Sequence, residues 1–233
     1  MYIDFKQAFD SVKRDRMLED LCNLGIPKKY ISLIKMTLQG SKAAVRVDGE
    51  LTPLFNINMG VREGDALPTM LFNLVLEAVI GKTNITGHIN TKSVQITAYA
   101  DDVAIISRNK PRLMKVFKQT DPEARKRGLK INEAKTKYMT VKRITDNENN
   151  ITIDNYTIKR VDAFTYLGTE INQKNSVSNE INASISSGNR TYYANKRLIT
   201  SKLLDKRTKM TIYKILIRPV VTYGCETWVM TKK

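Results

Sequence analysis

Two adjacent carboxylates, Asp101 and Asp102, stand between two short apolar runs at 96–98 and 103–106. Short β-prone runs on both sides of a polar dipeptide predict a hairpin whose turn carries the acids. Neighbouring anions repel each other, and an ionised carboxylate beside an apolar core is costly unless its charge is compensated. Asp is also common in ordinary turns, so the pair by itself leaves a purely structural role open.

A third acid, Asp4, lies on another short β-prone segment, residues 2–5. If this segment and the hairpin are adjacent strands, Asp4, Asp101 and Asp102 meet at one end of a sheet. Such a cluster needs cations, and all-oxygen ligands favour hard Mg²⁺ or Mn²⁺ over zinc. Two such ions about 3.5–4 Å apart can stabilise both the attacking and the leaving oxygen in phosphoryl or nucleotidyl transfer. The three acids are compatible with a metal site for this chemistry, but their charge alone does not require one.

The elements that must position these acids are a mixture of strands and helices. Pro68 is well placed to open a helix that reaches about residue 80, and because this helix is apolar on nearly all sides we expect it to be buried. A basic helix starts near Pro111, and Pro122 is expected to begin a new turn capped by Asp121. The other expected helices cover about 15–24, 28–38, 179–198 and 206–221, and the expected hairpins turn at Asp48-Gly49 and Asp154-Asn155.

The chain, at 233 residues, is long enough for one large domain or two modest ones. Strands and helices followed by a basic helical tail indicate an α+β domain with an appended helical unit. The polar stretch at 146–150 is the expected boundary between them.

The chain is strongly basic, with a formal net charge of +16 and a pI near 9.8. This balance suits a polyanion, and nucleic acid is the leading partner because Lys and Arg that neutralise phosphates release condensed counterions. An anionic membrane is the competing partner, but the apolar stretch at 67–80 is too short to cross one and carries Glu77.

Cys22 and Cys225 lie far apart without metal-binding spacing. Two reduced thiols and the lack of a signal peptide predict an intracellular protein, nuclear or cytoplasmic, that is not secreted.

Six segments occur in a characteristic order along the chain: 2–10, 60–67 with Phe72-Asn73, 99–102, 128–132 with 135–137, 164–168 and 217–228. They resemble, in this order, the first and second palm motifs, the Tyr-Ala-Asp-Asp catalytic hairpin, the motif that follows it, the primer-supporting segment and the thumb region of reverse transcriptases. The closing segment is similar to that of non-LTR (LINE-type) retrotransposon polymerases. The resemblance covers essentially the whole chain.

This resemblance implies an α+β fold in which residues 1–145 form a polymerase palm, an antiparallel sheet with helices on one face. Residues 146–175 would form a hairpin connection with a primer-grip-like segment, and 176–233 a basic, mainly helical thumb-like region. Because Asp4 stands three residues from the first residue, the fingers that precede this motif in the family are expected to be absent. The endonuclease is expected to be absent too, and the chain to be part of a larger retrotransposon polyprotein.

The activity that the resemblance implies is RNA-directed DNA polymerisation, in which two Mg²⁺ or Mn²⁺ ions are held by Asp4, Asp101 and Asp102. The partners would be an RNA template, a DNA primer and deoxynucleoside triphosphates. Lys135 is a candidate proton donor to the leaving pyrophosphate, although a solvated Lys is the alternative. Phe9 would lie beneath the sugar and exclude a ribose 2′-hydroxyl, unless it is an ordinary core residue.

Further residues are implied to bind nucleotide or nucleic acid. Arg62, Gly64 and Tyr99 join Phe9 as candidates for the nucleotide pocket. Tyr166, Leu167, Gly168, Arg190, Lys196 and Arg197 are candidates for contact with the primer or the nucleic-acid backbone, with a solvated basic face as the alternative for the cations. A second interpretation of the whole chain is a non-catalytic module that binds RNA or an RNA–DNA hybrid through its basic surface.

Overall fold

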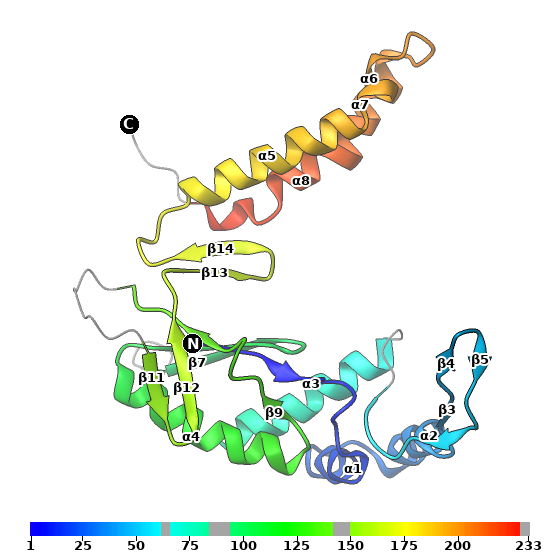
Figure 1. The fold of residues 1–233 in the computed structure, drawn as a ribbon, viewed down its shortest axis with the longest axis vertical. Coiled ribbons are helices and arrows are strands. Elements are labelled where there is room, and N and C mark those ends of the chain that lie inside the picture. Colours follow the sequence, from blue (N-terminus) through cyan, green and yellow to red (C-terminus); the bar gives the residue numbers. More distant parts are fainter. Residues whose placement is uncertain (62–65, 84–93, 142–149, 229–233) are drawn as a thin grey trace. The chain divides into compact units, whose positions relative to one another are not determined.

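The computed structural model describes residues 1–61, 66–83, 94–141 and 150–228 (Figure 1). Contacts within the chain define two compact units. The first comprises Met1–Tyr138 with Glu148–Arg160, and the second comprises Met139–Asn147 with Val161–Lys233. The segment 148–160 therefore belongs to the first unit, whereas the sequence suggested that it would be part of a separate connection.

A six-stranded sheet forms the frame of the first unit, with the strand order β11-β12-β10-β1-β8-β7. Neighbouring strands are antiparallel, except that β10 and β12 are parallel. The sheet is therefore mixed and not purely antiparallel, because the β11–β12 hairpin joins it through its second strand. The strands are β1 (Tyr2–Ile3), β7 (Val94–Tyr99), β8 (Asp102–Ser107), β10 (Lys137–Tyr138), β11 (Asn150–Ile153) and β12 (Tyr156–Arg160).

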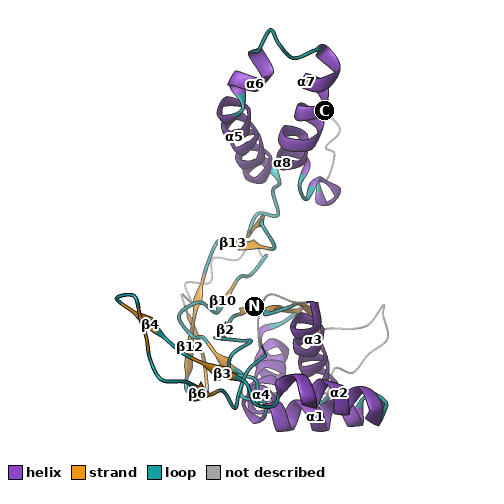
Figure 2. Cartoon of the chain, turned by 90° about the vertical axis from the view of Figure 1, so that its right-hand side faces the viewer, coloured by secondary structure: helices purple, strands orange, loops and turns teal. Residues whose placement is uncertain are grey.

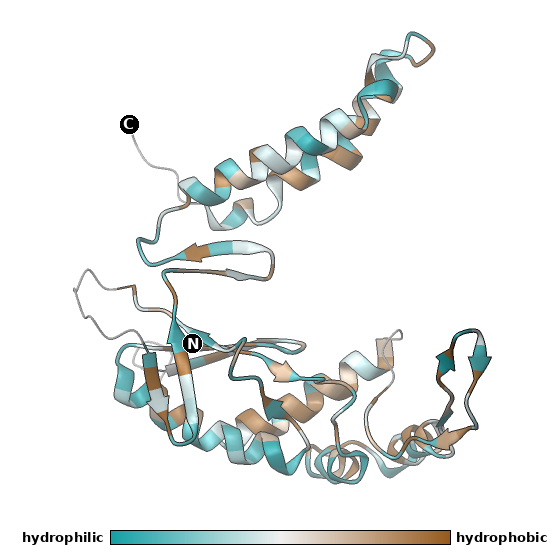
Figure 3. Cartoon of the chain, viewed as in Figure 1, coloured by the Kyte–Doolittle hydropathy of each residue, from teal (hydrophilic) through white to brown (hydrophobic). Residues whose placement is uncertain are grey.

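Helices α3 (Ala66–Gly81) and α4 (Lys110–Lys126) lie on one face of this sheet, and α1 (Arg14–Asn23) packs against α3 (Figure 1). The core between them contains fully buried Phe72 from α3 and Phe117 from α4. Figure 3 shows that apolar residues occupy much of α3. The expectation that this helix is buried nevertheless holds for one side only, because Met70 is 61% exposed. Only one side of α3 contacts the core, since its buried residues are Pro68, Leu71, Phe72, Val75, Leu76 and Val79.

Helix α4 continues without a break through Pro122, so the expected new turn at Asp121 was also wrong. A proline inside a helix removes one backbone hydrogen bond and crowds the carbonyl four residues earlier. Here Pro122 is exposed, so the carbonyl of Lys118 that loses its partner lies on the solvent side. Buried Thr120 and Ala124 on either side hold the helix to the core, and this packing outweighs the local preference.

Several short elements complete the first unit. Helix α2 (Lys28–Leu38) follows α1, and β2 (Phe5–Lys6) pairs with β9 (Lys130–Ile131). The hairpin expected at Asp48-Gly49 is present, and both turn residues have a positive φ, of 49° and 94°. Two central residues with positive φ are the mark of a type I′ turn, which explains why Asp-Gly is favoured there. Its strands are β4 (Arg46–Val47) and β5 (Glu50–Leu51), and β3 (Lys42–Ala43) pairs with β6 (Phe55–Asn56).

The second unit combines one hairpin with a pair of antiparallel helical arms, which Figure 2 shows side by side. The two arms differ from the two uninterrupted helices that the sequence suggested, because one breaks at Asn195 and the other contains a π-helical turn. Gly188 is where the arms touch, since a Cβ there would lie 2.3 Å from a methyl carbon of Val221. The elements are β13 (Ala163–Tyr166), β14 (Thr169–Asn172), α5 (Ser178–Ala194), α6 (Lys196–Thr200), α7 (Lys206–Ile212), the π-helix Tyr213–Ile217, α8 (Arg218–Thr222) and the 3₁₀ turn Cys225–Thr227.

Two further observations concern the described part of the chain. Cys22 and Cys225 are free thiols, and both are exposed. Among the described helices, none combines the length and the apolar character needed to cross a membrane.

Candidate active site

The pairing of β1 with β8 brings Asp4 opposite Asp102. Ile3 is the partner of Val103 in this antiparallel pair. Asp4 follows Ile3 and Asp102 precedes Val103, so the next cross-strand position joins the two acids. Residues directly opposite each other in such a pair have Cα atoms about 4.5–5.5 Å apart, which is close enough for their side chains to interact.

Asp101 reaches the same end of the sheet through the turn between β7 and β8. Tyr99 pairs with Asp102, so Ala100 and Asp101 form a two-residue turn. Ala100 has a φ of 51°, in the left-handed region that a residue with a Cβ adopts at a cost of roughly 1–2 kcal/mol. Tyr99 is 70% exposed beside the acids. The tight turn therefore holds two adjacent carboxylates and a tyrosine at one edge.

The three acids influence one another electrostatically. Burial raises the pKa of Asp102 above its ordinary value, and the nearby charges of Asp101 and Asp4 raise it further. Asp4 Oδ2 is a buried oxygen, and no hydrogen-bond partner for it is found in the described part of the chain. A cation at this end of the sheet would offset both the repulsion and the missing partner.

Replacing Asp102 with Asn is expected to raise the thermal stability of the metal-free chain at neutral pH. The pKa of Asp102 is higher in the folded chain than in the unfolded chain. Asp102 therefore makes its full favourable contribution to the free energy of unfolding below the unfolded pKa of about 3.9, and this contribution is lost as pH rises through the folded pKa. The gain from Asn should thus be present at pH 7, below about 1 kcal/mol because solvent screens an exposed group, and vanish near pH 3. Thermal unfolding of both proteins across this range measures it; a gain that is larger at pH 3 would contradict the assignment.

The acids do not form a ready-made metal cluster. In the ranges that the structure describes, no group of three His, Cys, Asp or Glu side chains is arranged to hold a metal ion. Their chemistry nonetheless fits a hard divalent cation, because all the available donors are carboxylate oxygens and one of them is buried without a hydrogen-bond partner among the described residues.

The backbone of Asp4 is clamped by the segment that follows β9. Its N–H donates to Thr136 Oγ1 at 3.3 Å, and its carbonyl accepts from the N–H of Asn132 at 2.8 Å. Thr136 is fully buried, and Lys135 beside it is exposed. The segment that carries Lys135 thus holds the strand end that carries Asp4, and Thr136 is a positioning residue that the sequence analysis missed.

Phe9 is partly buried, and its ring stacks on Phe72 with centroids 4.6 Å apart. It therefore packs against the edge of the core and is not enclosed within it, an arrangement compatible with either of the two roles expected for this ring. Arg62 and Gly64, which were also predicted to contribute to the nucleotide pocket, lie outside the described residues.

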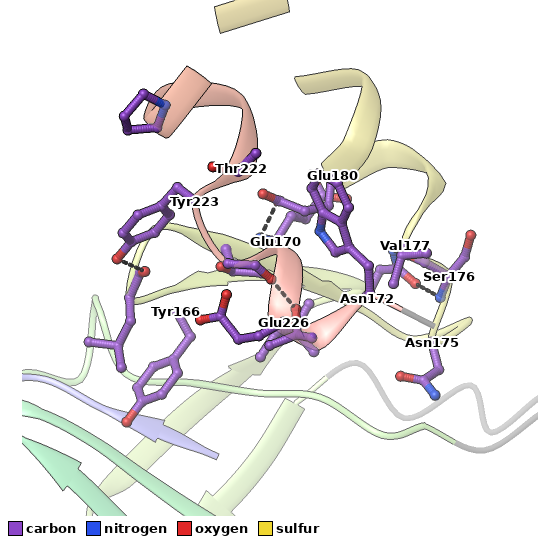
Figure 4. A pocket seen from close by; sticks show the side chains of 17 residues that line it. Tyr166, Glu170, Asn172, Asn175, Ser176, Val177, Glu180, Thr222, Tyr223 and Glu226 are labelled. Carbon is purple, nitrogen blue, oxygen red and sulfur yellow. Dashed lines mark hydrogen bonds between the residues drawn. The ribbon is translucent and has the colours of Figure 1, made fainter. Parts of the chain in front are cut away.

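In the second unit, the predicted primer-supporting residues form the turn of the β13–β14 hairpin. Tyr166 pairs with Thr169, and the turn residues Leu167 and Gly168 have φ values of 49° and 80°. The hydroxyl of Tyr223 donates to the carbonyl of Leu167 at 2.9 Å (Figure 4). A left-handed leucine is strained, so this bond from another segment helps to hold the turn.

A cavity of about 680 Å³ lies beside this hairpin in the same unit. Figure 4 shows Glu170, Glu180 and Glu226 among its lining residues. The carboxylate of Glu180 is buried and accepts the backbone N–H of Glu170 at 2.7 Å. This bond ties the first turn of α5 to β14, so Glu180 braces the hairpin.

The predicted nucleic-acid-binding cations of the second unit are exposed on its helical arms. Arg190 lies on α5, and Lys196 and Arg197 open α6. The ammonium of Lys196 lies 5.9 Å from the ring centroid of Tyr193, which is 67% exposed. The exposure of Tyr193 beside a cation makes its ring a surface that a base or sugar could contact.

Comparison with protein families identifies the fold that carries these acids. Residues 1–171 match the model of the reverse transcriptase (RNA-dependent DNA polymerase) family. The chain belongs to the reverse transcriptase family. The match includes the carboxylate end of the sheet and the β13–β14 hairpin.

Relatives of this reverse transcriptase chain come from non-LTR retrotransposons, which confirms the resemblance seen in the sequence. The RNA-directed DNA polymerase from the mobile element jockey of Drosophila melanogaster is 26% identical over 243 residues, covering 100% of this chain and 26% of that protein. A Pol polyprotein from the type-1 retrotransposable element R2 of Popillia japonica is 29% identical over 144 residues, covering 60% of this chain and 20% of that protein. The chain thus spans about a quarter or less of the length of these relatives.

Solved structures confirm the α+β polymerase-like fold of the reverse transcriptase. The telomerase of Candida tropicalis in complex with a TWJ fragment of telomeric RNA has a TM-score of 0.56 and 16% identity, covering 97% of this chain and 37% of that chain. The apo telomerase of the same organism, truncated from the C-terminal domain, has a TM-score of 0.53 and 18% identity, covering 73% and 33%. At these identities the likeness shows the fold alone.

Proposed function

We propose that this chain is the palm and thumb-like portion of an RNA-directed DNA polymerase that extends a DNA primer on an RNA template. The observation that carries the proposal is the meeting of Asp4, Asp101 and Asp102 at one end of the first unit's sheet, where partial burial, and then the charges of Asp101 and Asp4, raise the pKa of Asp102. In this proposal the first unit supplies the catalytic acids. The second unit supplies the primer-supporting hairpin of Tyr166, Leu167 and Gly168.

Reverse transcriptases as a family use divalent metal ions, and this chain offers carboxylate oxygens to hold them. Asp4 and Asp101 would be the main ligands, with Asp102 beside them. Bound Mg²⁺ or Mn²⁺ would activate the primer 3′-hydroxyl and neutralise the charge of the triphosphate. The protein's own part is to fix the acids at the strand end and to present Lys135, which would protonate the leaving pyrophosphate, on the neighbouring turn.

Primer extension by the 233-residue chain tests the proposal. The assay contains an RNA template, a labelled DNA primer, deoxynucleoside triphosphates and Mg²⁺, with EDTA in a parallel reaction. Extension that requires Mg²⁺ and follows the template sequence supports the proposal. Extension no greater than that of the Asp101→Asn/Asp102→Asn variant would overturn polymerisation by this chain.

A second candidate function is binding of an RNA–DNA hybrid without catalysis. It is favoured by the net charge of +16 and by the exposed Lys196, Arg197 and Tyr193 of the second unit. Cations that follow a phosphate backbone give affinity without reading base sequence. This function would persist in a protein whose carboxylates have been neutralised.

Replacing Lys196 and Arg197 together with Gln is expected to weaken binding to an RNA–DNA hybrid about tenfold at low salt. The slope of log affinity against log salt should become less steep by about 2, because each lost phosphate contact removes close to one counterion. Fluorescence anisotropy over a salt series measures both quantities. Lys28→Gln/Lys29→Gln on exposed α2 is the matched control, and an equal loss in the control would show general charge attraction only.

A further inference from the structure

Arg14, in the first turn of α1, binds three separate segments of the first unit. Its Nε donates to the carbonyl of Gly60 at 2.8 Å, and its Nη1 donates to the carbonyls of Leu38 at 2.7 Å and Ile57 at 2.9 Å. These carbonyls lie at the end of α2, just after β6 and at the start of the loop before α3. One partly buried guanidinium therefore connects three segments of the chain.

Gly60 is in turn bonded to the loop that carries Phe9. The N–H of Gly60 donates to the carbonyl of Val12 at 2.8 Å, and the N–H of Val61 donates to the carbonyl of Phe9 at 2.9 Å. Arg14 and Phe9 thus bind the same peptide group, the one between Gly60 and Val61. Arg14 donates to its carbonyl oxygen, and the carbonyl of Phe9 accepts its N–H. The backbone of Phe9 is connected to Arg14 through a short, continuous chain of hydrogen bonds.

Two glycines let these segments approach closely. A Cβ on Gly60, whose φ is 79°, would lie 2.7 Å from the carbonyl oxygen of Asp10. A Cβ on Gly128, whose φ is 93°, would lie 2.0 Å from the carbonyl oxygen of Ser11. The loop between β2 and α1 is therefore approached closely by other backbone segments at Asp10 and at Ser11, and a side chain at either glycine would push it away.

Arginine is the side chain suited to this junction. Its planar guanidinium carries five N–H donors in a fixed geometry and stays charged, whereas the ammonium of Lys acts as a single point of charge. A carbonyl left without a donor in a partly buried junction loses its hydrogen bond without regaining a full one from water, which is unfavourable. A Lys at this position can satisfy one or two of the three carbonyls at most.

We propose that Arg14 is a positioning residue for the nucleotide pocket: by fixing Gly60 it fixes the backbone of Phe9, and so sets how strongly the site rejects a ribonucleotide. This inference rests on the proposed polymerase function for its kinetic part. Its structural part, the fixed position of the Phe9 loop, holds whether or not the chain extends primers.

The first test is amide hydrogen exchange in the full chain with Arg14→Gln. We expect the amides of Gly60 and Val61 to exchange at least about tenfold faster, while the amide of Ile105, which is bonded to the Met1 carbonyl in the sheet, exchanges at its original rate. Unchanged exchange at Gly60 and Val61 overturns the inference. Arg14→Lys is the second variant if Gln prevents folding, and an intermediate rate is expected for it.

The second test is the ratio of kcat/KM for deoxynucleotides to that for ribonucleotides. We expect Arg14→Gln to lower this ratio about tenfold, mainly through a higher kcat/KM for ribonucleotides, because a displaced Phe9 would exclude the ribose 2′-hydroxyl less strictly. A role limited to general stability would change the active fraction but leave the ratio as it was, so an unchanged ratio overturns the positioning role. Arg16→Gln is the matched control, because Arg16 is exposed and pairs only with Glu19 among described acids.

These tests separate the inference from the proposed function. A wild-type chain that extends no primer contradicts the proposed function and, with it, the kinetic part of the inference; hydrogen exchange in Arg14→Gln then decides the structural part, the fixed position of the Phe9 loop. A wild-type chain that extends primers, together with an Arg14→Gln variant of unchanged selectivity, contradicts the inference alone.

Discussion

Replacing Asp101 and Asp102 together with Asn is expected to reduce primer extension by at least about 10³-fold, which corresponds to about 4 kcal/mol of transition-state stabilisation. Asn keeps the size of Asp but removes the charge that would hold a divalent cation and offset the charge of the triphosphate. Two of the three acids that meet at this end of the sheet are then neutral. Extension rates under single-turnover conditions, with Mg²⁺ in excess, measure the loss.

Asp48→Asn is the control for this substitution. Asp48 is exposed in the β4–β5 turn and has a φ of 49°, a conformation that Asn adopts readily. This variant makes the same chemical change away from the acid cluster and is expected to extend primers at the wild-type rate. Equal loss in both variants would point to a general effect of charge. Full activity in the double Asn variant would exclude the acids from catalysis.

The paired acids were predictable because the chemistry and the turn that presents it are adjacent in sequence. Apolar residues on both sides of Asp101 and Asp102 require a hairpin, and the β-prone stretch before Asp4 needs a partner in the same sheet. Val103, Ala104 and Ile105 are all buried, so β8 is covered on both faces there. Local pattern was sufficient for this part of the site.

The features that were missed depend on long-range contacts that leave no periodic signal. Arg14 looks like a helix-surface cation in the sequence, and only the fold brings three carbonyls to it from 24 to 46 residues away. Nothing in the sequence around Thr136 indicates that its hydroxyl will accept a hydrogen bond from the backbone of Asp4. Pro122 misled for the opposite reason, because a local rule was outweighed by burial of the neighbouring turns of α4. A single sequence therefore predicts the secondary structure that each segment prefers better than it predicts the contacts between segments.

The other large effect is expected in stability, at the ion pair between Asp20 and Arg127. Nε and Nη2 of Arg127 donate to the two carboxylate oxygens of Asp20 at 2.6 and 2.8 Å, and Nη1 donates to Glu123 Oε2 at 3.0 Å. The side chains of Arg127 and Asp20 are only 8% and 11% exposed. The pair joins α1 to the end of α4, where the backbone of Arg127 also accepts the N–H of Lys13 at 2.9 Å.

Replacing Arg127 with Met is expected to destabilise the first unit by about 3–5 kcal/mol, because the carboxylate of Asp20 is left buried and unpaired. For a unit of this size the melting temperature should fall by roughly 10 °C. Calorimetric unfolding, read for the first unit's transition, measures the change. Arg16→Gln, which removes an exposed pair with Glu19, should cost less than about 0.5 kcal/mol.

The double variant Asp20→Leu/Arg127→Met separates two explanations of that loss. The loss of stability in Arg127→Met can come from leaving the charge of Asp20 buried and unpaired. In that case removing both charges should restore stability to within about 1 kcal/mol of the wild type, since a buried apolar pair of similar volume has no charge that must be paired. If instead the bidentate bond itself holds α1 against α4, the double variant should remain as unstable as Arg127→Met. Recovery would mean that the pair contributes specificity to the packing of the two helices more than net stability.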